Sequence, residues 1–168
     1  MDVSFINHFI ESAANVFNTM LECPLKRTSL RLKTEAEPAH EVSALIGLSG
    51  THVGSLVLSL SREVALKATE RLLLVEFDDV TPDVVDAVGE LSNMIAGGAK
   101  AAMAHLNLSL GLPNVIVGKA QKIYFPGDVS PITVSFTTPW GELAIEVGFD
   151  TRLEGNISQV DQRATVSC

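Results

Sequence analysis

Apolar side chains recur at intervals of three and four positions between residues 81 and 106, and this pattern constrains the fold more than any other. A helix turns about 100° per residue, so residues at this spacing share one side of a helix. The segment opens with Thr81-Pro82-Asp83, which combines a capping hydroxyl, a first-turn proline and a first-turn acid. We therefore expect a long helix with one side buried in the core. Its apolar side is formed by Val84, Val88, Leu91, Ile95, Ala99, Ala102 and Leu106.

The opposite side of this predicted helix carries Asp86, Glu90, Asn93 and Gly97, which return to nearly the same bearing. Glu90 and Asn93 are three residues apart, so their side chains are neighbours. A carboxylate can hold a cation, and a carboxamide can orient a water molecule through its oxygen or its NH2 group. Gly97 removes bulk, so the backbone of another molecule could approach. The pattern predicts an exposed acid–amide pair, although Glu-x-x-Asn alone also fits an ordinary solvated helix face.

The remaining periodicity predicts one α+β domain over residues 1–154, followed by a polar tail over residues 155–168. Helical spacing from Val3 to Leu21 predicts a first helix that Pro24 ends, and Ser61 is placed to cap another helix over residues 62–74. We expect strands near residues 28–37, 41–49, 55–61, 114–125, 132–138 and 142–149. This order favours a largely antiparallel sheet covered by long helices.

Two details of the strands bear on surfaces. Residues 28–37 carry Arg31, Lys33, Glu35 and Glu37 at alternate positions, as expected of an edge strand with one charged face. The last two strands are joined through Pro139-Trp140-Gly141, which puts the single tryptophan at a hairpin tip. We expect Trp140 to pack back onto the sheet rather than to anchor a partner.

Charge and composition exclude several classes of protein. The formal net charge of −8 argues against nucleic acids and anionic membrane surfaces as partners. No apolar run approaches the roughly 18 residues of a transmembrane helix, and the first residues lack the basic region of a signal peptide, so we expect a cytoplasmic protein. Cys23, which we expect to be buried, and Cys168 are too few for a disulfide framework or a zinc site. The histidines lack metal-ligand spacing, so we expect no bound metal. They are His8, His40, His52 and His105.

The run Glu90-Leu-Ser-Asn93-Met-Ile-Ala-Gly97, with Asp86 four residues before the glutamate, resembles the signature of the CheX-type chemotaxis phosphatases in the CheC–CheX–FliY superfamily. Pro113, in Leu-Ser-Leu-Gly-Leu-Pro-Asn-Val-Ile-Val-Gly, belongs to the same pattern. The resemblance covers roughly residues 1 to 150 and includes a helix beginning at Phe5-Ile6-Asn7 and a glycine-rich hairpin over residues 47–56. A single Glu-x-x-Asn copy favours CheX, because CheC-type relatives carry two.

This resemblance implies a CheC/CheX-like fold and a hydrolase that removes the aspartyl phosphate of a CheY-like response-regulator receiver. It implies that Glu90 ion-pairs with a conserved receiver lysine and that Asn93 orients the attacking water, as a glutamine does in GTPases. Asp86 would support Glu90 or the interface, and Pro113 would shape the adjoining loop. The divalent metal, Mg²⁺, would belong to the receiver, with no cofactor bound by this chain. CheX-type relatives pair through their sheets, so we also expect a homodimer.

Other interpretations of the same residues stay open. The chain could be a non-catalytic module that binds a receiver or a flagellar component through the same helix, or a domain whose inherited motif is idle. It could also be a metal-dependent hydrolase with its own cation on Asp86 and Glu90. Two carboxylates one helical turn apart, without a histidine beside them, are a sparse set of ligands for that role. The sequence does not identify the cognate receiver or its pathway.

Overall fold

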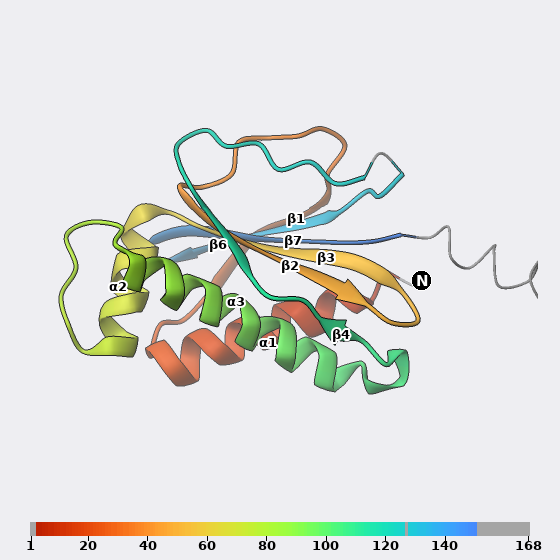
Figure 1. Ribbon diagram of the computed structural model, residues 1–168, viewed down its shortest axis with the longest axis horizontal. Helices are drawn as coiled ribbons and strands as arrows, with labels where there is room; N and C mark the ends of the chain where they lie inside the picture. Colours follow the sequence, from red (N-terminus) through yellow and green to blue (C-terminus); the bar gives the residue numbers. More distant parts are fainter. Residues whose placement is uncertain (1–2, 127, 151–168) are drawn as a thin grey trace, which may run out of the picture.

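Three long helices cover one face of a seven-stranded sheet in the computed structural model, which describes residues 3–126 and 128–150 (Figure 1). The helices are α1 (Phe5–Leu21), α2 (Arg62–Leu73) and α3 (Pro82–Ala102), and a short 3-10 turn, η1 (Ala104–Leu106), follows α3. The strands are β1 (Lys26–Leu32), β2 (Val42–Ser49), β3 (Val53–Leu60), β4 (Ser109–Leu110), β5 (Asn114–Val117), β6 (Ile132–Thr138) and β7 (Gly141–Asp150). The predicted tail, residues 155–168 with Cys168 at its end, lies outside the described ranges.

The strands follow the order β1-β6-β7-β3-β2-β4, and β5 also pairs with β2. Every strand pairing in the sheet is antiparallel. The strand β1 therefore forms one edge, while β4 and β5 lie along the opposite edge. This arrangement confirms the expected α+β class with an antiparallel sheet covered by helices.

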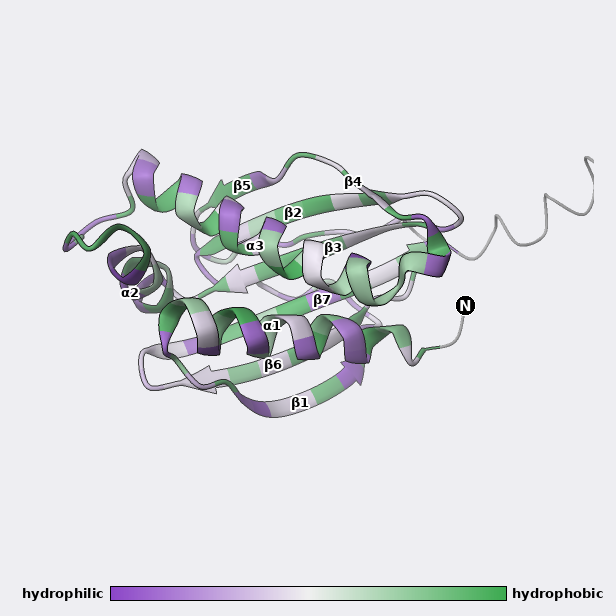
Figure 2. Cartoon of the chain, turned by 90° about the horizontal axis from the view of Figure 1, so that it is seen from below, coloured by the Kyte–Doolittle hydropathy of each residue, from purple (hydrophilic) through white to green (hydrophobic). Residues whose placement is uncertain are grey.

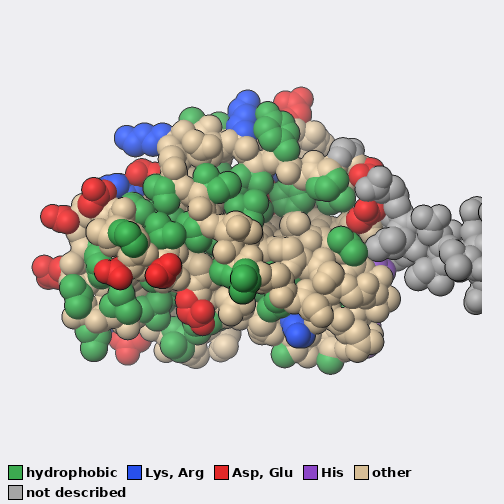
Figure 3. All heavy atoms as spheres, in the orientation of Figure 1, with side chains coloured by type: hydrophobic (Ala, Val, Ile, Leu, Met, Phe, Trp, Pro, Cys, Tyr) green, Lys and Arg blue, Asp and Glu red, His purple; other side chains and the backbone are tan. Residues whose placement is uncertain are grey.

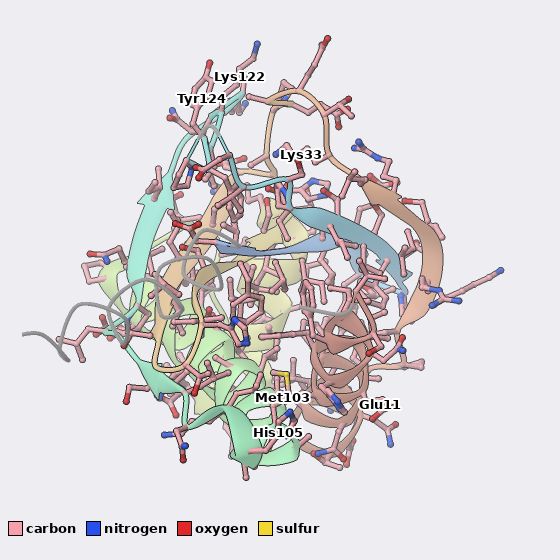
Figure 4. The ribbon with its side chains drawn as sticks, turned by 90° about the vertical axis from the view of Figure 1, so that its right-hand side faces the viewer. Glu11, Lys33, Met103, His105, Lys122 and Tyr124 are labelled. Carbon is pink, nitrogen blue, oxygen red and sulfur yellow. The ribbon has the colours of Figure 1, made fainter. Side chains whose placement is uncertain are left out.

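The core lies between the helices and the inner face of the sheet. Alternate residues of β3 (Leu56, Leu58 and Leu60) are fully buried there, as the two-residue period of a strand requires. The predicted apolar side of α3 is confirmed from Val84 to Ala99. It is wrong at its end, because α3 stops at Ala102, which is exposed. The next residue, Met103, is 1% exposed and fills the core there instead (Figure 4).

Helices α2 and α3 differ in how their first turns are capped. The Ser61 hydroxyl accepts a hydrogen bond from the Val64 backbone N–H at 3.4 Å, which confirms the predicted cap of α2. Thr81 occupies the cap position of α3, but its hydroxyl makes no capping bond and is buried without a partner among the described residues. The capping role predicted for Thr81 is therefore wrong. Pro82 and Asp83 remain as the favourable first-turn residues of α3.

The predicted strand over residues 114–125 is also wrong in extent. Only Asn114–Val117 forms β5, and the two-residue β4 precedes it. After Val117 the Gly118 N–H still donates to the Glu41 carbonyl at 2.9 Å, and the chain then leaves the edge to cross the outer face of the sheet (Figure 1). Strand pairing depends on a partner that is distant in sequence, so alternation alone could not locate this end.

The outer face of the sheet is partly covered by the segments 33–41, 118–126 and 128–131. Lys33 lies beneath them, 6% exposed, and its Nζ donates to both carboxylate oxygens of Glu146 at 2.7 and 2.8 Å. Figure 4 shows Lys33 inside this region, whereas Lys122 and Tyr124 point outward. The predicted charged face over residues 28–37 is therefore wrong, because β1 ends at Leu32 and Lys33 turns inward to its partner.

Other expectations are confirmed. Cys23 is buried, and the hairpin between β6 and β7 turns at Pro139 and Trp140. Trp140 is half-buried and packs against the core, as expected. Among the described helices, none combines the length and apolar character needed to cross a membrane.

Candidate active site on helix α3

Helix α3 lies in the helical layer with α1 on one side and the edge strands of the sheet on the other (Figure 2). Its buried residues, including Leu91 and Ile95, hold it against the sheet. Hydrophilic residues recur along the N-terminal half of its outward surface. The core therefore fixes the orientation of α3, and with it the direction of the side chains on its free side.

The predicted polar stripe lies on this free side. Asp86 and Glu90 are exposed, and Asn93 and Gly97 are half-buried. Within residues 3–126 and 128–150, the side chains of Asp86, Glu90 and Asn93 have no hydrogen-bond or ion-pair partner. Their polar groups are therefore available to a molecule that docks against α3.

Pro113 lies beside the same part of α3. A Cβ atom built on Gly89 would lie 3.5 Å from Pro113 Cγ and 3.6 Å from Val115 Cγ2. The loop between β4 and β5 thus packs closely on the helix backbone one residue before Glu90. This contact places Pro113 next to the stripe and is consistent with the expected loop-shaping role. The preceding residue, Leu112, is 88% exposed on the same flank.

The two adjacent glycines of α3 have different surroundings. A Cβ on Gly97 would meet nothing within 4 Å, so this position opens onto solvent. A Cβ on Gly98 would overlap with the Ser12 hydroxyl of α1. That hydroxyl donates to the Ile95 carbonyl of α3 at 2.7 Å, which joins the two helices two residues after Asn93. Gly98 is therefore needed for helix packing, and Gly97 leaves the outer surface free.

This difference predicts opposite effects on stability. Gly97→Ala should raise the free energy of unfolding by up to about 1 kcal/mol, since alanine favours helix and the space is free. Gly98→Ala should lower it by about 1 kcal/mol, because the new methyl group displaces Ser12 from its hydrogen bond. Urea unfolding measures the free energy of unfolding of both glycine variants. Ser12→Ala, measured in the same way, gives the effect of losing the Ser12 hydrogen bond alone. Equal stability of the two glycine variants would contradict the assignment.

Acidic side chains gather over α2 and the N-terminal half of α3 on the face shown in Figure 3, with a basic side chain near the C-terminal end of α3. Asp83, Asp86 and Glu90 lie on the exposed surface of α3 in its N-terminal half, and Lys100 is exposed in its last turn. The exposed surface of this helix therefore changes from negative to positive along its length.

A cluster of three histidines could not be predicted from their spacing in the sequence, because they come from three separate segments. His8 of α1, His52 of the β2–β3 loop and His105 of η1 line one pocket of about 260 Å³. In the described part of the chain, no group of three or more His, Cys, Asp or Glu residues is placed to hold a metal ion. Asp86 and Glu90 accordingly belong to no such group there.

One antiparallel sheet and three covering helices, the longest of which carries an outward acid–amide pair, define a CheC-like α+β protein. The CheC-like superfamily protein from Shewanella sp. PV-4 superposes with a TM-score of 0.83 at 33% identity, over 89% of this chain and 99% of that one. The chain belongs to the family of the chemotaxis phosphatase CheX, whose pattern it matches over residues 42–137.

One further relative and one further solved structure are similar to this chain. The CheY-P phosphatase CheX of Thermotoga maritima is 28% identical over 138 residues, which are 80% of this chain and 89% of that protein. The CheX–CheY–BeF3–Mg²⁺ complex of Borrelia burgdorferi has the same fold, with a TM-score of 0.73 at 24% identity over 88% of this chain and 99% of that one.

Proposed function

We propose that this protein hydrolyses the aspartyl phosphate of a CheY-like receiver, using Glu90 and Asn93 of α3. The observation that carries the proposal is the uncommitted Glu90–Asn93 pair on the open side of a helix fixed by the core, in a chain of a phosphatase family. A relative named CheY-P phosphatase and a relative in complex with CheY, BeF3 and Mg²⁺ support the choice of substrate.

The chemistry needs positioning more than a strong base. Phosphoryl transfer passes through a loose transition state in which the attacking and leaving oxygens lie in line with phosphorus. Water attacks the phosphorus, the bond from phosphorus to the aspartyl oxygen breaks, and inorganic phosphate and a free carboxylate are formed. The Asn93 carboxamide orients that water through its oxygen and NH2 group without taking its proton. No nucleophile of this chain takes part.

The role of Glu90 in this mechanism is to bind the receiver. It lies one turn before Asn93, and it ion-pairs with a lysine at the receiver's phosphorylation site. That pair fixes the position of α3 along the receiver, so that Asn93 enters the site. Asp86 adds negative charge to the same interface, and Gly97 lets the receiver backbone approach.

The direct test mixes the purified chain with each phosphorylated CheY-type receiver of its own organism and measures phosphate release. Faster release than from the receiver alone supports a phosphatase. Binding of a receiver without faster release would instead identify a non-catalytic binding module and contradict the proposal.

The divalent metal in this reaction belongs to the receiver. We predict that the isolated chain binds no stoichiometric metal and that Mg²⁺ is required only for receivers that themselves bind it. Elemental analysis of the purified chain, dialysed without chelator, measures the first point. One equivalent of bound metal per chain would favour a metal-dependent hydrolase with its own cation.

We also propose a homodimer formed through β1. This strand is the outermost of its edge, so its outer backbone groups lack a strand partner in the described sheet. Leu30 and Leu32 on it are 47% and 55% exposed, which is apolar area that a second copy would cover. Light scattering at micromolar concentration should give twice the chain mass of 17.9 kDa. A mass near one chain would contradict the dimer.

A further inference from the structure

A groove of about 620 Å³ lies between the C-terminal end of α3 and β4. It is lined by Gly97, Lys100, Ala101, Ala104, Asn107, Leu108 and Leu110. Glycine and alanines form its helical wall, and Leu108, which is 3% exposed, and Leu110 give it apolar side chains. The groove is therefore shallow and mainly apolar, with the Lys100 ammonium and the Asn107 carboxamide as its polar groups.

The groove continues the surface that carries the acid–amide pair. Gly97, Lys100 and Ala101 follow Asn93 by four, seven and eight residues, so they extend the same stripe of α3. Gly97 lies at the junction, since it belongs to the stripe and lines the groove. At 1.5 Å per residue, Ala101 lies about 12 Å along the helix from Asn93. A protein that places a group at Asn93 is therefore within reach of this groove.

The far wall of the groove is held by the β2–β3 hairpin. The Leu106 carbonyl accepts a hydrogen bond from the Thr51 N–H at 3.2 Å. Gly50 has a φ of +143° and approaches the Asn107 carbonyl so closely that a Cβ atom would overlap with it. These contacts fix the turn after α3, so the groove exists before any partner arrives.

Charge defines the kind of side chain that fits. Lys100 is exposed at the groove and has no ion-pair partner among the residues that the structure describes. The carboxylates at the other end of α3, Asp86 and Glu90, face the proposed lysine of the receiver. A partner that fits this end of α3 would therefore present an apolar side chain to the groove and a carboxylate to Lys100.

We propose that this groove is the second contact of the receiver. An apolar side chain of the receiver enters between Ala101 and Leu110. A neighbouring carboxylate pairs with Lys100, about 10 Å along the helix from Asn93. The inference rests on the proposed function. It makes the groove a determinant of which receivers are substrates, separate from the residues that act on the phosphate.

Two variants test the groove. Ala101→Trp fills it, and Lys100→Glu reverses its charge. Both should weaken binding of the receiver loaded with BeF3 and Mg²⁺ at least tenfold and raise KM for the phosphorylated receiver, while kcat at saturation stays within twofold. The loss caused by Lys100→Glu should shrink in high salt. Matched controls are Asn18→Trp on the exposed side of α1 and Lys119→Glu beyond β5, which should bind as the wild type does.

The results of these experiments distinguish failure of the groove proposal from failure of the proposed function. If both groove variants bind the loaded receiver with wild-type affinity, the groove is not part of the interface, even where Asn93→Ala abolishes turnover. If kcat falls instead of KM rising, the groove acts on chemistry and the docking assignment is wrong. If the wild type binds no receiver of its organism, the proposed function fails and the groove proposal falls with it. Thermal unfolding of each variant confirms that it is folded.

Discussion

Replacing Asn93 by alanine should lower kcat for receiver dephosphorylation about 100-fold or more, because a water-orienting group acts mainly in the transition state. Affinity for the receiver loaded with BeF3 and Mg²⁺ should stay within about twofold, since Glu90 and the rest of the α3 surface are unchanged. Asn93 is half-buried without a partner in the described structure, so alanine removes no internal hydrogen bond and should leave the fold intact.

Single-turnover phosphate release at saturating protein separates this loss from weaker binding. Asn18→Ala, at an exposed asparagine of α1, is the matched control and should keep the wild-type rate. Asn93→Asp keeps the size but replaces the NH2 donors with charge, and it should be as impaired as alanine. Wild-type hydrolysis by Asn93→Ala would show that this side chain does not position the water.

Replacing Glu90 by alanine should reduce affinity and turnover together. Loss of one partner of an interfacial ion pair costs about 2 kcal/mol or more, equivalent to about a 30-fold rise in Kd. Because Asn93 then lacks its fixed position in the receiver, kcat should fall as well, and kcat/KM should drop by about 1000-fold in total.

Glu63→Ala, at an exposed glutamate in the first turn of α2, controls for the loss of one negative charge on this acidic protein. Titration of the loaded receiver at low and high salt measures the electrostatic part of the Glu90 contact. If Glu90→Ala lowers kcat with unchanged Kd, the glutamate acts on the reaction and not on docking.

The sequence was most informative where local periodicity decides structure. The stripe from Asp86 to Gly97 could be placed correctly because the core fixes the rotation of α3, and the buried residues from Val84 to Ala99 were visible in the spacing. The sheet class could be predicted from alternation and turns. The positions of these residues therefore followed from the pattern, while their chemical roles came from family resemblance and stay proposals.

The sequence was least informative where the decisive partner is distant. The sequence alone does not distinguish Gly97 from Gly98. The neighbour that distinguishes them is Ser12, which lies 83 residues from its bonding partner Ile95. Lys33 looked like a solvated edge charge, and its partner Glu146 is 113 residues away. Three histidines at one pocket could not be recognised for the same reason.

The bond between Ser12 and Ile95 has a consequence for signal timing in the proposed pathway. It joins α1 to α3 beside Asn93, so we expect the proposed catalytic surface to be in place before it meets a receiver. Below saturation, the lifetime of the phosphorylated receiver should then be inversely proportional to the copy number of this protein in the cell. A cell would shorten its response by making more of the protein, with no need for an activating ligand.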